Sequence, residues 1–330
     1  MSATSINGKG PAPEERSYYG QPVIKEPIWT WEIPCYFFTG GLAGASSALA
    51  HFAELQDNTE LARRAWIVAL ASNATSPVLL TSDLGRPARF LNMLRMIKVT
   101  SPMSLGSWVL AANGVSAGIR VANMWAGVLP RTARVARTAA AYAGLPLATY
   151  TAALVSNTAI PVWHAARREL PFVFAAGAGL SAGAVGVIVT PPEHAKPARR
   201  LALASAPLEL GLMKLMEHRL GELAEPYKQG TAASLARLSR ACILGGSALL
   251  ARRGGSSRGG AVAAGVLMSA GALAARWSVF KAGFQSAADP KYVVGPQRSA
   301  IEQGRRRGGA RRQSRVAGAD PSIGSPATTV

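Results

Sequence analysis

Apolar stretches of about 20 residues alternate with short polar connections along most of the chain, and a helix of that length spans the hydrocarbon core of a bilayer. Eight such windows occur, at residues 33–52, 62–83, 104–127, 138–160, 170–190, 200–217, 239–252 (extended towards the N-terminus) and 261–282. The pattern predicts an all-α integral membrane protein with eight transmembrane helices. An even number of spans places both termini on one side of the membrane.

The polar pattern at the two ends sets the predicted domain boundaries. Residues 1–32 are polar, rich in proline and glycine, and lack the apolar core of a signal peptide. Residues 284–330 lose apolar periodicity and become rich in arginine, glycine and serine. We therefore predict a polar N-terminal segment, a transmembrane domain over residues 33–283 and a disordered basic tail.

Composition and charge support a membrane protein. Only 16% of the residues are charged, whereas an ordinary soluble domain has roughly 25%. The net charge of +19 favours nucleic acid or an anionic membrane surface as a partner. The basic residues recur in short clusters between apolar stretches, as at Arg63-Arg64, Arg167-Arg168 and Arg199-Arg200. This distribution is typical of the flanks of membrane spans, so we expect a lipid bilayer as the partner and no nucleic acid.

Cysteine and histidine usage limits the chemistry that the chain itself carries. Two cysteines, Cys35 and Cys242, are too few for an iron–sulfur cluster or a four-thiolate zinc site. The four histidines fall at or near the ends of apolar windows, where they do not form the facing pairs that a membrane haem needs. We expect no haem, no iron–sulfur cluster and no metal centre in this chain.

Polar side chains gather at one membrane face of the first four predicted spans. Polar groups in or beside a span are costly unless they serve a function or reach out from a helix end. An Asp83–Arg86 ion pair is one expectation there, with a purely structural turn as the alternative. The group suits an amphipathic, planar head group, and its members are Glu32, Tyr36, Asp83, Arg86, Ser101, Trp108, Tyr150 and His164.

Three segments together resemble the membrane-subunit family of polysulfide reductases (NrfD/PsrC). They are YYGQPVIKEPIWTWEIPCYFFTGGLAGAS, DLGRPARFLNMLRMIKVTSPMSLGSW and YTAALVSNTAIPVWHAARRELPFVFAAGAGLSAG. Their order and spacing cover about residues 18–190, and the number of predicted spans extends the resemblance to about residue 283.

The resemblance implies two four-helix bundles, over residues 33–160 and 170–283, and a site for menaquinone or ubiquinone in the first. It also implies a ferredoxin-like iron–sulfur partner subunit, often joined to a molybdopterin catalytic subunit, in a prokaryotic plasma membrane. Tyr150 matches the family's tyrosine in the fourth span. Ile33 and Tyr36 stand where a relative has Asn and His, so head-group bonding passes to Glu32, Tyr36 or Asp83, while Arg86, Ser101, Trp108 and His164 serve structure or partner docking.

The sequence allows more than one membrane orientation and more than one function. Lysine and arginine are more frequent on the side of the termini, which favours cytoplasmic termini. The leading hypothesis is a quinone-reactive membrane anchor of a respiratory oxidoreductase, not catalytic alone, and the alternatives are a secondary transporter or a quinone-independent scaffold. Glu209, Lys214 and Glu217 form either part of a proton path or a paired structural stripe.

Overall fold

The computed structural model describes residues 23–83, 92–95, 97–255, 257–296, 298, 301 and 304. The described residues are mostly helical and include no strand. It has two compact units. One comprises residues 24–288, and the other comprises residues 1–23 and 289–330, of which 291–296 are helical.

Eight helices of 20 residues or more lie within the described part of the larger unit. Their order along the chain is α1 (Glu32–Leu55), α2 (Thr59–Asp83), α4 (Pro102–Ala126), α5 (Pro130–Ser156), α7 (Leu170–Val189), α8 (Lys196–Leu220), α9 (Gly230–Arg253) and α10 (Arg258–Ala288). A short helix, α6 (Pro161–Ala165), follows α5, and a 3-10 segment, η2 (Gly221–Lys228), joins α8 to α9.

These helices occupy the eight predicted windows, with shifted ends. Helix α5 covers residues 130–156 instead of 138–160, because Pro130 starts it early and the chain leaves it before Pro161. Several basic residues expected in loops therefore lie within helix ends, Arg137 among them. Helix α10 continues to Ala288, so the helical domain does not end at residue 283.

Three helices in the described part are long and apolar enough, by composition, to cross a membrane: α2, α7 and α10. The other five long helices are also long enough, but glycine, serine and charged residues lower the mean hydropathy of their apolar stretches below that of these three. The number of eight spans stays a prediction.

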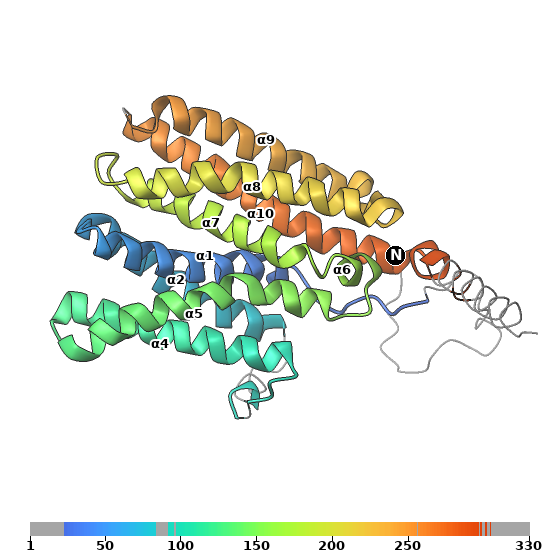
Figure 1. Ribbon diagram of the computed structural model, residues 1–330, viewed down its shortest axis with the longest axis horizontal. Helices are drawn as coiled ribbons and strands as arrows, with labels where there is room; N and C mark the ends of the chain where they lie inside the picture. The colour runs from blue at the N-terminus through green and yellow to red at the C-terminus, as the bar shows by residue number, and fades with distance from the viewer. Residues whose placement is uncertain are drawn as a thin grey trace, which may run out of the picture. The chain divides into compact units, whose positions relative to one another are not determined.

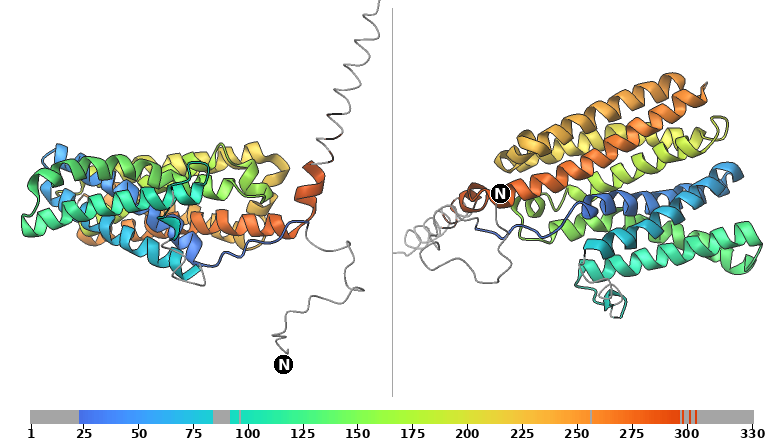
Figure 2. Two further views of the ribbon diagram at one scale, coloured as in Figure 1. Left: turned by 90° about the horizontal axis from the view of Figure 1, so that it is seen from below. Right: turned by 180° about the vertical axis from the view of Figure 1, so that it is seen from behind.

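The helices pack in two sets that share an interface (Figures 1 and 2). In the first set, α1 packs against α2, α4 and α5, and α4 packs against α2 and α5. In the second set, α7 packs against α8 and α10, and α9 packs against the same two helices. Helix α7 also packs against α1 and α5, which joins the two sets into one unit.

Small residues set the closest crossings between helices. A Cβ atom on Gly44 of α1 would lie 2.3 Å from the carbonyl oxygen of Gly144 on α5, and one on Gly183 of α7 would lie 2.4 Å from the backbone nitrogen of Ala202 on α8. Backbones approach this closely only without side chains, as in tightly packed membrane helices. The connections are short, so long helices that follow one another in the chain run antiparallel. The N-terminus of α1 therefore lies at the same end as the C-termini of α2, α5 and α8 (Figure 1).

Candidate functional site

The segment before α1 is bound to the end of α2 through one carboxylate. The backbone nitrogen of Thr30 donates to Oδ1 of Asp83 at 3.1 Å, and the Thr30 hydroxyl contacts the same oxygen at 2.9 Å. The hydroxyl also contacts the carboxylate of Glu32. Since a hydroxyl carries a single proton to donate, Glu32 and Asp83 share one donor. Both carboxylates are only partly buried, so this end of the first helix set presents polar groups at the surface.

Tyr36 lies one helical turn deeper than Glu32 on the same side of α1, because residues four apart in a helix share a face. Its side chain is 0% exposed. Its hydroxyl is buried and has no hydrogen-bond partner among the described residues. An unsatisfied buried hydroxyl costs about 1–3 kcal/mol, so Tyr36 carries a donor that lacks an acceptor among the described residues.

Tyr150 of α5 completes the aromatic pair. The two tyrosine rings meet edge to face, with centroids 6.4 Å apart and an interplanar angle of 66°. The Tyr150 ring lies against Gly106 of α4, where a Cβ atom would fall 1.9 Å from Cε2 of Tyr150. Helices α1, α4 and α5 therefore converge on these two rings, and Gly106 leaves the space that Tyr150 occupies.

Ser101 and Trp108, also predicted as site residues, have separate places on α4. The Ser101 hydroxyl accepts a hydrogen bond from the backbone nitrogen of Ser104 at 3.4 Å and caps the helix, with Pro102 in the first turn. This is a structural role that suits a helix N-terminus. Trp108 is exposed, whereas its neighbour Ser107 is buried.

At α6 the buried anchor is Trp163, and the predicted site residue His164 is exposed. The Trp163 indole donates to the carbonyl oxygen of Val279 on α10 at 2.8 Å and stacks on Trp29 with a centroid distance of 5.6 Å. Nδ1 of His164 lies 3.2 Å from the carbonyl oxygen of Ser156. The tryptophan, not the histidine, thus joins the segment before α1 to the second helix set.

A buried polar layer crosses the middle of the first helix set, and sequence reasoning missed it. The Asn113 side chain of α4 donates to the Ser47 hydroxyl of α1 at 3.1 Å and to the carbonyl oxygen of Ala140 on α5 at 2.8 Å. It accepts from Asn73 of α2 at 2.9 Å. Two asparagines in the middle of apolar windows were the available signal, because a buried amide needs partners from neighbouring helices.

A second missed group lies at the opposite end of the same helices. Glu54, near the end of α1, accepts from the Trp66 indole at 2.7 Å and from Nε of Arg120 at 2.8 Å. Its other oxygen pairs with Arg137 of α5 at 3.2 Å. The carboxylate follows the predicted end of the first span, where it was indistinguishable from an ordinary loop residue.

The structure brings together four of the predicted site residues and gives Ser101, Trp108 and His164 separate places. Glu32, Tyr36, Asp83 and Tyr150 lie at one end of the first helix set. Arg86 lies outside the described residues, so its predicted pairing with Asp83 stays a prediction. The described partner of Asp83 is Thr30.

The fold and this site define a polytopic helical membrane protein with an aromatic and carboxylate site at one end of a four-helix set. The family model for polysulfide reductase, NrfD type, matches residues 16–289, and the chain belongs to this family. No curated protein matches the sequence. Membership indicates a membrane subunit of a respiratory oxidoreductase.

Proposed function

We propose that this chain exchanges electrons between the membrane quinone pool and an iron–sulfur partner subunit, which in turn serves a molybdopterin catalytic subunit. The proposal rests on family membership together with one observation, the buried Tyr36 hydroxyl that has no partner among the described residues. A quinone carbonyl is an acceptor of the kind that this donor lacks.

The chemistry of the residues present suits a quinone head group. Tyr36 would donate to a carbonyl oxygen, and the Tyr150 ring would form one wall of the site. A bound quinone supplies coupled electron and proton transfer, which the side chains of this chain cannot provide alone. Glu32 lies one turn nearer the end of α1 than Tyr36, and Asp83 is the last residue of α2. The two carboxylates hold protons and pass them through the Thr30 hydroxyl that they share.

The test is Tyr36→Phe, which removes only the hydroxyl. A neutral hydrogen bond contributes about 0.5–1.5 kcal/mol net, so quinol-linked turnover of the assembled complex should fall about 2- to 12-fold. Dye-linked activity of the catalytic subunit should stay unchanged. The control is Tyr142→Phe, since Tyr142 lies on α5, the helix that carries Tyr150, but is 70% exposed. Equal effects of the two substitutions, or parallel loss of both activities, would contradict the assignment.

Copurification separates this function from its alternatives. An anchor subunit should bring iron–sulfur and molybdopterin polypeptides with it from the membrane. A secondary transporter should purify without them, and a quinone-independent scaffold should bring them yet show no effect of Tyr36→Phe.

We also propose that the protein lies in a prokaryotic plasma membrane with cytoplasmic termini, because the basic residues favour that side. A reporter that is active in only one compartment, fused after Val330, tests the orientation. Reporter activity on the outer side of the membrane would show the opposite orientation.

A further inference from the structure

The second helix set contains a buried carboxylate that the proposed quinone chemistry does not use. Glu209 of α8 is 1% exposed, and neither of its carboxylate oxygens has a hydrogen-bond partner among the described residues. A carboxylate without partners is strongly disfavoured away from water. Water, a bound proton or the charge of a neighbouring cation must therefore offset this cost.

Arg276 of α10 lies near Glu209 but is directed elsewhere. It is 2% exposed, its Nη2 donates to the carbonyl oxygen of Phe174 at 2.8 Å, and its guanidinium lies 4.1 Å from the centre of the Phe174 ring. Its Nη1 has no partner among the described residues. Gly177 of α7 leaves the space between the two groups, because a Cβ atom there would lie 2.5 Å from Nη2 of Arg276 and 2.6 Å from Oε1 of Glu209.

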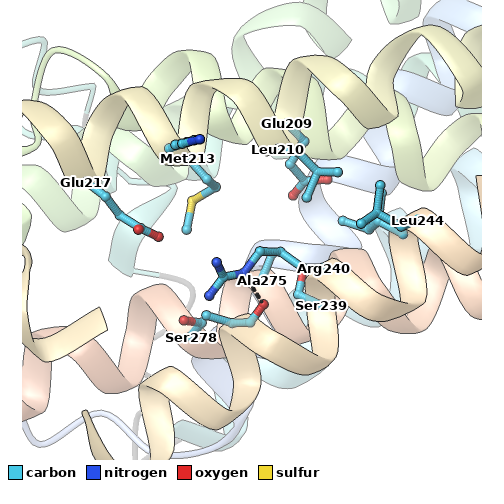
Figure 3. Close-up of a pocket in the computed structure, with 12 residues that line it drawn as sticks. Glu209, Leu210, Met213, Glu217, Ser239, Arg240, Leu244, Ala275 and Ser278 are labelled. Carbon is cyan, nitrogen blue, oxygen red and sulfur yellow. Dashed lines mark hydrogen bonds between the residues drawn. The ribbon is translucent and has the colours of Figure 1, made fainter. Parts of the chain in front are cut away.

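Glu209 lines a cavity of about 320 Å³ among α8, α9 and α10 (Figure 3). At about 30 Å³ for each water molecule, this volume holds roughly ten. Part of the wall is polar and includes Glu217 of α8, Ser239 and Arg240 of α9, and Ser278 of α10. Cavities with several polar partners take up water, whereas wholly apolar ones stay dry.

A second cavity, of about 360 Å³, continues towards η2. The two cavities share Glu217 and Arg240, and the second is also lined by Tyr227 and Lys228. Burial raises the pKa of Tyr227, so its hydroxyl stays protonated at neutral pH. Glu209 and Glu217 are eight residues apart, about 12 Å along α8, and lie on one helix face.

We propose that these two cavities form a water-filled path from the η2 end to Glu209, which binds and releases a proton within the second helix set. A proton from water at η2 passes along the path and forms the O–H bond of the Glu209 carboxylic acid, and release returns it to water. The charged groups that face Glu209 and its path come from four elements, while α7 contributes the uncharged Gly177. They are Lys214 and Glu217 on α8, Lys228 on η2, Arg237 and Arg240 on α9, and Arg276 on α10. The site is separate from Tyr36 and needs no quinone.

Cysteine accessibility tests whether the path holds water. In the full-length chain in membrane vesicles, with Cys35→Ser and Cys242→Ser as background, Ser239→Cys should react with a small cationic methanethiosulfonate. Ser181→Cys on α7 is the matched control, because Ser239 is 4% exposed and Ser181 is 3% exposed. A buried thiol in apolar surroundings is unreactive, so the rates should differ by at least about tenfold.

Infrared difference spectroscopy tests the proton. A pH step should produce a carboxylic acid C=O band that shifts in D₂O, that is lost in Glu209→Gln and that persists in Glu217→Gln. Equal thiol rates for the two serine positions would show a dry cavity and overturn the proposal, as would reaction with a lipid-soluble maleimide alone, which would indicate a lipid occupant. A band that is unchanged in Glu209→Gln would also overturn it. Neither measurement requires quinone turnover, so a negative result here leaves the proposed function standing. A negative result for Tyr36→Phe likewise leaves this proposal standing.

Discussion

The crossing of α1 and α5 is expected to tolerate no side chain at Gly44. In Gly44→Ala the new Cβ atom would lie 2.3 Å from the carbonyl oxygen of Gly144 and 3.1 Å from the backbone nitrogen of Ala148. Both are backbone atoms, so no rotamer change relieves the clash. To restore an ordinary contact of 3.4 Å the helices must separate by about 1.1 Å, which forfeits up to half of the dispersion energy of the atoms facing the gap.

The expected loss is about 2–3 kcal/mol, in the upper part of the range for overpacked cores. For a domain of this size, the melting temperature should then fall by about 4–12 °C. The assay is thermal unfolding of the full-length protein in detergent, followed by far-UV circular dichroism. Since α5 also carries Tyr150, quinol-linked turnover should fall with it.

Gly245→Ala is the control with the opposite sign. Gly245 is exposed on α9, and a Cβ atom there meets nothing within 4 Å. Alanine favours a helix over glycine by up to about 1 kcal/mol, so this variant should be neutral or slightly more stable. If Gly44→Ala melts at the temperature of Gly245→Ala, the α1–α5 contact is not as close as described and the reasoning is refuted.

Two further predictions concern carboxylates. Glu54→Gln should lower the free energy of unfolding by about 2–3 kcal/mol. This is less than the roughly 3–5 kcal/mol expected for a fully buried pair, because Arg120 and Arg137 are partly solvated. Adding Arg137→Gln should recover part of the loss in a double-mutant cycle of melting temperatures. Asp83→Asn should slow quinol-linked turnover while leaving dye-linked activity intact. Thr30→Val should slow turnover too, because it removes the hydroxyl that the two carboxylates share, while the backbone donor still holds Asp83 in place. Equal turnover in Asp83→Asn and the parent protein would exclude Asp83 from the proton route.

The positions of the eight long helices followed from the sequence alone. Membrane helices are local structures whose backbone hydrogen bonds close within each segment, so an apolar window predicts a helix without knowledge of its neighbours. The four residues Glu32, Tyr36, Asp83 and Tyr150 were also predictable as one group, because short connections place their helix ends on the same face.

Contacts between helices were decided by the tertiary structure. The sequence could not indicate that Trp163 rather than His164 is buried, since both follow Pro161 and only the surface of α10 selects between them. It likewise gave no reason to pair Glu54 with Arg137, which are 83 residues apart and meet because Gly44 and Gly144 let α1 and α5 approach. Apolar periodicity encodes which segments become helices, whereas the side-chain partners depend on helix rotation and crossing, which are set by packing over the whole unit.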